Sequence, residues 1–168
     1  RYGAWAAAVR VHRDAAVVTA AADLEGLDQT STAAELAAAI AFLRCAAATG
    51  TSFDLFVDNA SVVHGLQRIL AERAAATGQR TGRPATTSCV LPRYSFAQWQ
   101  LAERLLGQCA ADCGIHWVPS HGKQKDWRAD PAEDTAHARR INRDADEAAG
   151  RQCADRGQRE HRTALYDQ

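Results

Sequence analysis

The segment of residues 53–65 constrains the fold more than any other stretch of this sequence. Phe53, Leu55 and Val57 fall on one face at a period of two, which is typical of a strand with one buried side. The strand ends at Asp58, and an apolar helical pattern follows at once. A strand that turns directly into a helix is typical of an α/β domain, in which ligands bind at the carboxyl ends of the strands.

Asp58 has two interpretations at this position. As the last residue of a strand it is a candidate for ligand binding, but it also stands where a side chain can help to cap the next helix. Asn59 and Ser61 are further capping candidates for that helix, which we predict to reach about Ala76. Caps are far commoner than active sites, so the rest of the sequence has to decide between the two interpretations.

Length and composition narrow the choice of function only slightly. The 168 residues are enough for one domain with a real core. The 20 basic and 20 acidic residues cancel, so a nucleic-acid surface requires local clustering of charge. We find no apolar run long enough to span a bilayer and no secretory signal, and we expect no membrane partner.

The cysteines and the first residue bear on the origin of the chain. Five cysteines, an odd number scattered along the sequence, favour reduced thiols in an intracellular protein of the cytoplasm or nucleus. The chain begins at Arg1 and contains no methionine. We therefore expect it to be a segment of a longer protein.

The remaining elements follow from periodicity and from turn residues. We predict a hairpin of residues 2–11 and 15–22, and a helix over residues 32–49. A further helix is predicted over residues 94–113, a short strand over 115–118 and a last helix from 141 onward. Gly50 is expected to end the first helix. The basic stretch 123–140 is expected to be a loop, and residues 1–155 to form one domain followed by a frayed polar tail at 156–168.

Glu35 also has two interpretations. The spacing Thr32-x-x-Glu35 at the start of a helix is a capping box, in which the glutamate reaches back to the N-cap amide. That pattern by itself favours capping over chemistry. The position of Glu35 relative to other carboxylates favours a role in metal binding instead.

Three carboxylates fall at the sheet-facing ends of three different elements, namely Glu35, Asp58 and Asp146. His121 follows the last strand on a loop. Carboxylates gathered at one edge repel each other unless cations lie between them, and oxygen ligands of this kind suit Mg²⁺ or Mn²⁺. Two such ions about 4 Å apart can activate a water and stabilise the leaving oxygen of a phosphodiester.

With these residues in this order, the sequence resembles a type 1 ribonuclease H domain of the kind attached to the reverse transcriptases of retroelements. The matching segments are Tyr2-Gly3-Ala4, Thr30 to Leu36, Val57-Asp58-Asn59 with Gly65, Trp99, Trp117 to His121, and Asn142-x-x-Ala145-Asp146-x-x-Ala149. Their order and spacing carry the resemblance over almost the whole chain to about residue 155. It implies an α/β ribonuclease H-like fold, a mixed sheet flanked by helices.

The resemblance implies a role for each matching side chain. Glu35, Asp58 and Asp146 would be ligands for two Mg²⁺ ions, or for Mn²⁺, and His121 would assist near the second metal ion. Thr32, Asn59, Asn142 and Lys123 are candidates for contacts to nucleic acid. The substrate implied is the RNA strand of an RNA–DNA hybrid, whose groove shape and 2′-hydroxyl groups such proteins read. A reverse transcriptase domain in the same parent chain is the implied partner.

Two departures from the family pattern matter. The family begins with a central strand that carries its first metal-binding aspartate, and that strand is absent from this sequence. We therefore expect this polypeptide to cleave poorly or not at all, and the parent protein to cleave the hybrid. The loop between His121 and Asn142 is also longer than usual, and it is basic and carries Trp127. It either extends the grip on the hybrid or is a tolerated surface insertion.

Three alternatives remain open on the sequence alone. Cys109 and Cys113, with His116 and His121, suggest a zinc site, although the spacing matches no usual finger. The domain can instead be a catalytically inactive ribonuclease H-like module that binds nucleic acid or acts as a scaffold. The third alternative is a purely structural domain, in which the three carboxylates lie far apart.

Overall fold

The computed structural model describes residues 4–9, 18–23, 30–50, 52–76, 96–109, 112–120, 124–129 and 135–166. Within these ranges the chain forms helices and strands in the order β1 (Ala4–Val9), β2 (Val18–Asp23), α1 (Ser31–Thr49), β3 (Phe53–Val57), α2 (Ala60–Ala76), α3 (Phe96–Gln108), β4 (Cys113–Trp117) and α4 (Thr135–Tyr166). The predicted hairpin, first helix and Asp58 strand are all confirmed.

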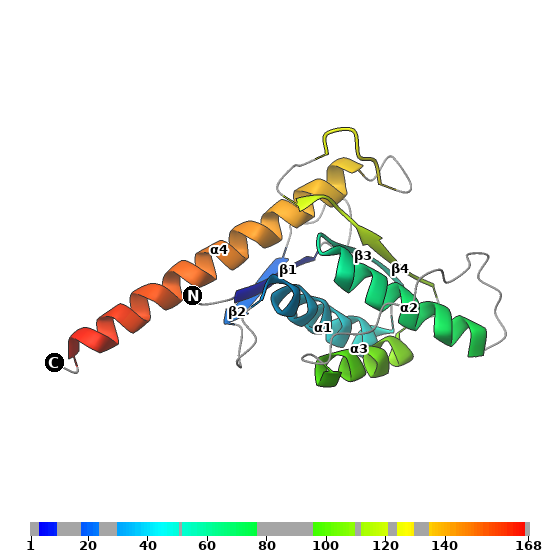
Figure 1. Ribbon diagram of the computed structural model, residues 1–168, viewed down its shortest axis with the longest axis horizontal. Helices are drawn as coiled ribbons and strands as arrows, with labels where there is room; N and C mark the ends of the chain where they lie inside the picture. Colours follow the sequence, from blue (N-terminus) through cyan, green and yellow to red (C-terminus); the bar gives the residue numbers. More distant parts are fainter. Residues whose placement is uncertain are drawn as a thin grey trace.

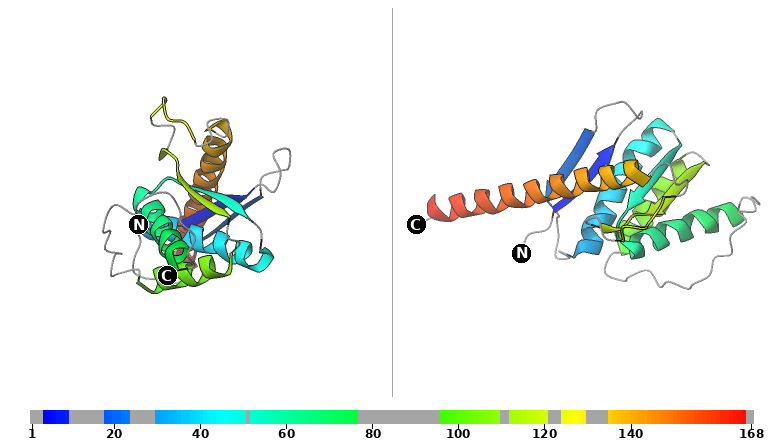
Figure 2. Two further views of the ribbon diagram at one scale, coloured as in Figure 1. Left: turned by 90° about the vertical axis from the view of Figure 1, so that its right-hand side faces the viewer. Right: turned by 90° about the horizontal axis from the view of Figure 1, so that it is seen from above.

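The helices form two layers with the strands between them (Figure 1). α1, α2 and α3 pack against one another and cover one side of β3 and β4, whereas α4 lies against β1 and β2 on the other side. Figure 2 shows α4 crossing the strands and projecting beyond them toward its C-terminal end. The strand layer is therefore covered on both sides, as in other α/β domains.

The strands form two separate sheets rather than one. β1 and β2 are an antiparallel hairpin in which Ala4 opposes Asp23, and β3 and β4 are a parallel pair in which Phe53 opposes Cys113. Among the described residues, neither β1 nor β3 has a second strand as a partner. This arrangement agrees with the expectation of a sheet that lacks its central strand.

The core lies between β3–β4 and the three helices α1, α2 and α3. Alternate residues of the two strands point into it, among them Val57 and Ile115, as the period of two predicts. Leu36, Leu66 and Leu106 are fully buried there. At Gly65 a side chain would collide with the indole ring of Trp99, so the close approach of α2 and α3 requires glycine at this position.

The two ends of α1 are capped by residues close to those that the sequence indicates. Gly50 ends the helix in a left-handed conformation, with φ of 62°, as predicted. The N-cap is Thr30, whose hydroxyl accepts from the N–H of Ala33, so the predicted capping box of Thr32 and Glu35 is wrong. Glu35 lies one turn inside the helix, too far along it to reach back to the cap.

Two predicted boundaries are also wrong. The helix expected to run to Cys113 ends at Gln108, and Cys113 is the first residue of β4. The last helix begins at Thr135 instead of residue 141, and it continues to Tyr166. The residues expected to be a frayed tail are therefore helical as far as Tyr166, and within this stretch Arg159 forms an ion pair with Asp23 of β2 at 3.3 Å.

α1 is long and apolar enough to cross a membrane by length and composition alone, contrary to the expectation of no such run. Core helices pass the same test. In this structure Leu36, Leu43 and Ala39 are buried against the neighbouring elements of the core.

Candidate functional site

A cavity of about 870 Å³ separates the two sheets. Its two sides are β1 and β3, and α1 and α4 close it from opposite faces of the strand layer. Most of the lining is small and apolar, because α1 and β1 contribute mainly alanines such as Ala6 and Ala38. The polar side chains in the lining include Glu35, Asn142 and Asp146, so two of the predicted metal ligands face the same space.

The pKa of the Glu35 carboxyl is strongly perturbed. Desolvation by burial, and after it the nearby negative charges of Asp58 and Asp146, together raise the pKa of Glu35 from 4.5 to about 8. Two carboxylates remote in sequence therefore lie close enough to Glu35 to affect its ionisation. At neutral pH the Glu35 carboxyl is mostly protonated until a bound cation offsets the effects of burial and of the two neighbouring charges.

Asp58 and Asn59 lie at the junction of β3 and α2. The side-chain oxygen of Asn59 accepts from the N–H groups of Ser61 and Val62 and so caps α2, at 3.1 and 3.3 Å. Its Nδ2 donates to the hydroxyl of Thr32 at 3.1 Å. Asn59 therefore has the predicted capping role, and it ties the first turn of α1 to the strand end that carries Asp58.

α4 brings Asn142 and Asp146 to the cavity. The residues of α4 that line it share one face of the helix, at His137, Ile141, Asn142, Ala145, Asp146 and Ala149. His137 also lines the cavity, four residues before Ile141 on the same face of the helix. Its place there follows from the start of α4 at Thr135, before the predicted residue 141.

Two predicted site residues, His121 and Lys123, lie outside the described residues, so their roles stay predictions. In the part of the chain that the structure describes, no three His, Cys, Asp or Glu side chains are close enough together to hold one metal ion. The donor chemistry of Glu35, Asp58 and Asp146 fits a divalent cation, and the charges that raise the pKa of Glu35 are those that a cation would neutralise. The metal site remains a prediction.

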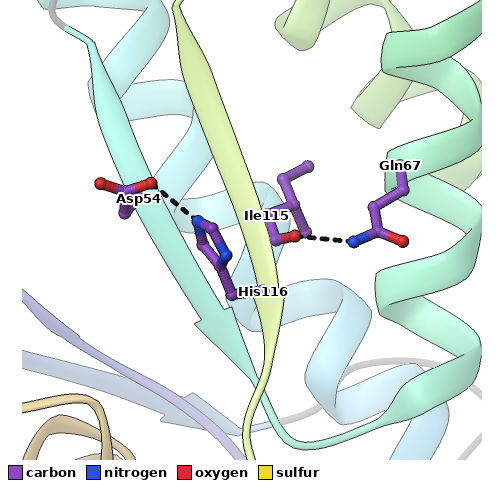
Figure 3. Close-up of polar contacts among 4 residues, drawn as sticks. All are labelled: Asp54, Gln67, Ile115 and His116. Carbon is purple, nitrogen blue, oxygen red and sulfur yellow. Dashed lines mark hydrogen bonds and ion pairs between the residues drawn. The ribbon is translucent and has the colours of Figure 1, made fainter. Parts of the chain in front are cut away.

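A histidine–carboxylate pair lies on β3 and β4, on the face away from the core. The Nε2 atom of His116 is 2.7 Å from Oδ1 of Asp54 (Figure 3), and the imidazole stacks on Phe56 with ring centroids 5.1 Å apart. His116 is thus engaged with a carboxylate. The zinc alternative with Cys109 and Cys113 has no metal-binding group of three among the described side chains, and neither cysteine forms a disulfide bond.

The indole of Trp117, the last residue of β4, supports the strand end from the other side. Its Nε1 donates to the backbone carbonyl of Asp58 at 3.0 Å. The amide of Val118, which follows Trp117, donates to the carbonyl of Val57 at 3.0 Å. Two adjacent residues at the end of β4 therefore fix the backbone around Asp58. Neither contact is visible from local sequence pattern.

No protein-family model matches this sequence, and a search of curated proteins finds no match either. Among solved structures, the chain is similar to the solution structure of the PFV RNase H domain, with a TM-score of 0.51 over 88% of this chain and 92% of that one. The two sequences are 14% identical, so the likeness establishes the fold and leaves the activity to other arguments. The fold is α/β and ribonuclease H-like, as predicted.

Proposed function

We propose that this chain is the main part of a metal-dependent endonuclease that hydrolyses the RNA strand of RNA–DNA hybrids, within a larger reverse-transcriptase or retroelement protein. The observation that carries the proposal is the electrostatic coupling of Glu35 to Asp58 and Asp146. Acids from α1, the end of β3 and α4 are close enough to perturb one another. Such convergence is unfavourable in the metal-free protein, because like charges repel and burial disfavours the ionised carboxylate.

The residues of the candidate site have different roles in this proposal. Glu35, Asp58 and Asp146 would hold divalent cations, which supply an activated water and stabilisation of the leaving oxygen when bound. Asn59 and Trp117 hold the backbone at Asp58, and Asn142 lies one helical turn before Asp146 on the same cavity wall. Glu35 must lose its proton to bind a cation, so Mg²⁺ binding at neutral pH releases a proton.

The cavity explains why activity should require a further strand. β1 and β3 both border it and have no other strand partner among the described residues, so an extended segment can hydrogen-bond to both at once. By the family resemblance, that strand would carry a fourth carboxylate beside Glu35 and Asp58. We therefore expect the described chain by itself to cleave poorly, as the sequence indicates.

The decisive experiment is a cleavage assay on an RNA–DNA hybrid with labelled RNA, in Mg²⁺. The chain is compared with a version extended before Arg1 by an apolar strand with one central aspartate, and with a matched version that has asparagine instead. We expect cleavage by the aspartate version, and little by the other two. RNA cleavage that survives Glu35→Gln, Asp58→Asn and Asp146→Asn together would contradict the proposal.

A catalytically inactive ribonuclease H-like module that binds nucleic acid is the second candidate. The absence of a three-ligand cluster among the described side chains favours it. It predicts hybrid binding in EDTA with no Mg²⁺-dependent cleavage by either extended version. It also predicts that Glu35→Gln leaves Mg²⁺ binding unchanged, which isothermal titration measures directly.

A further inference from the structure

The basic stretch between β4 and α4 has a defined conformation beside the candidate site. Residues 124–129, which we call the Trp127 loop, turn at Gln124, a non-glycine residue with a positive φ of 54°. The carbonyl of Gln124 accepts from the N–H of Trp127 at 2.9 Å and from Nη2 of Arg139 on α4 at 2.7 Å. A conformation of this kind persists only where its surroundings hold it.

The end of the Trp127 loop is fixed as well. Ala129 is buried, and its N–H donates to the hydroxyl of Thr135, the first residue of α4, at 2.9 Å. Figure 1 shows this segment, in yellow, beside the N-terminal end of α4. An insertion that is merely tolerated would not need a buried residue and side-chain hydrogen bonds at both ends.

Two aromatic rings connect the loop to the candidate site. The ring of Trp127 meets that of Trp117 edge to face, with centroids 6.5 Å apart and an interplanar angle of 90°. Trp117 in turn donates its indole N–H to the carbonyl of Asp58. The guanidinium of Arg139 lies 5.4 Å from the centroid of the Trp127 ring, a cation–π distance. Trp127 is therefore an anchor that places the loop near Asp58.

The described residues around this anchor carry an excess of positive charge. The exposed cations of residues 124–129 and 135–143 are Lys125, Arg128, Arg140 and Arg143, joined by the half-buried Arg139, and the only acid in these two ranges is Asp126. In the sequence between the two ranges, Asp130, Glu133 and Asp134 offset part of this charge. The whole chain has no net charge. A local excess of positive charge next to a group of acids attracts an anion to a place where the acids alone would repel it.

We propose that the Trp127 loop and the first turns of α4 are a docking surface for the phosphate backbone of a nucleic acid, held beside Asp58 by Trp127. The inference rests on the proposed function and names the element that brings the substrate to that site. Arg128 supports it, because its Nη1 already donates to the carbonyls of Lys125 and Trp127 and the guanidinium is held in place before any ligand binds. A prearranged cation loses less conformational entropy on binding phosphate.

The test measures the affinity of the chain for a fluorescein-labelled RNA–DNA hybrid by anisotropy, in EDTA, over a series of KCl concentrations. The variant Lys125→Ala with Arg140→Ala is compared with a matched control, Arg44→Ala with Arg104→Ala, which removes two exposed cations from α1 and α3. Loss of two phosphate contacts should weaken binding by about tenfold and lower the slope of log affinity against log salt by about two. The control should change neither quantity.

A second pair of variants tests the anchor. Trp127→Ala removes the ring between Trp117 and Arg139 and should weaken hybrid binding as much as the loss of the cations does. Trp127→Phe keeps an aromatic ring in the same place and should retain most of the affinity. Thermal melting of both variants distinguishes a released loop from an unfolded chain, because the core does not include Trp127.

The outcomes separate this inference from the proposed nuclease function. Equal affinity and equal salt slope for Lys125→Ala with Arg140→Ala and for its control overturn the docking surface, even if the strand-extended chain cleaves the hybrid. Loop-dependent binding without any cleavage supports the docking surface and contradicts the nuclease. Loop-dependent binding to phosphatidylserine vesicles, with no binding of the hybrid, overturns the docking surface as well.

Discussion

The packed half of the molecule, formed by α1, α2, α3, β3 and β4, and the hollow half, formed by β1, β2 and α4 around the cavity, bury very different side chains. The packed half contains all members of the main hydrophobic cluster, with leucines, valines and Trp99 in it. In the described part of the hollow half the buried side chains are alanines, such as Ala4, Ala138 and Ala148. Stability therefore resides mainly on one side, and the candidate site lies where the two halves meet.

The comparison predicts its largest effect on stability in the packed half. Leu66→Ala should lower the free energy of unfolding by about 2–5 kcal/mol, because Leu66 is fully buried and the hole left behind is not refilled. Trp5→Ala, at a half-buried position in the cavity wall, should cost about 1 kcal/mol or less despite the larger side chain removed. Urea unfolding measures both values. Equal losses would remove the distinction between the halves.

The second prediction concerns the border between the halves. Asp58→Asn should lower Mg²⁺ affinity, and it should reduce cleavage by the strand-extended chain by about a hundredfold or more, since a bound metal ion contributes several kcal/mol to catalysis. Asp54→Asn is the matched control, because Asp54 belongs to the same strand but pairs with His116 at an exposed position. An equal loss of activity in both variants would show that the strand as a whole, and not the position of Asp58, matters.

The third prediction concerns pH, in protein kept free of metal. Because the folded-state pKa of Glu35 is raised from 4.5 to about 8, its contribution to stability is complete below about pH 4.5 and is lost as the pH rises toward 8. The loss should be about 2 kcal/mol between pH 5.5 and 7.0, at about 1.4 kcal/mol per pKa unit. Glu35→Gln should flatten this dependence. Urea unfolding in EDTA across this range tests it, and a wild-type curve as flat as that of the variant would contradict it.

The smallest predicted effect is at Asn59, in the packed half next to the candidate site. Asn59→Ala removes the cap of α2 and should cost about 1 kcal/mol. Asn59→Asp keeps an oxygen for the cap but loses the donor to Thr32, so it should cost less in stability. It should disturb Mg²⁺ binding more than an equally stable variant elsewhere, since it removes the amide donor of Asn59 to the first turn of α1, next to Glu35 and Asp58.

The packed half was easier to predict from sequence than the hollow half. The period of two in β3, the cap at Asn59 and the stop at Gly50 are local signals, and each is confirmed. α4 was predicted to begin too late because it packs through alanines, so its early turns carry no apolar stripe. The cap of α1 was assigned to Thr32 instead of Thr30 because both are threonines near the same helix start, and only the tertiary contact of Thr32 with Asn59 separates them.

The candidate site was predictable as a set of residues but not as a geometry. The family resemblance singled out Glu35, Asp58 and Asp146, and the pKa of Glu35 reports that the other two are near. The contacts that hold the site in place join residues far apart in sequence, as when Trp117 donates to the carbonyl of Asp58. Pairing between distant strands sets such contacts, and no local pattern encodes them.

The border strands of the cavity have a consequence for handling the protein. β1 and β3 present backbone groups toward an apolar hollow, and exposed strand edges of this kind can pair with strands of neighbouring molecules. At high concentration two copies can satisfy these edges in each other, giving dimers or aggregates. Dilute solutions should therefore keep the protein monomeric better than concentrated stocks.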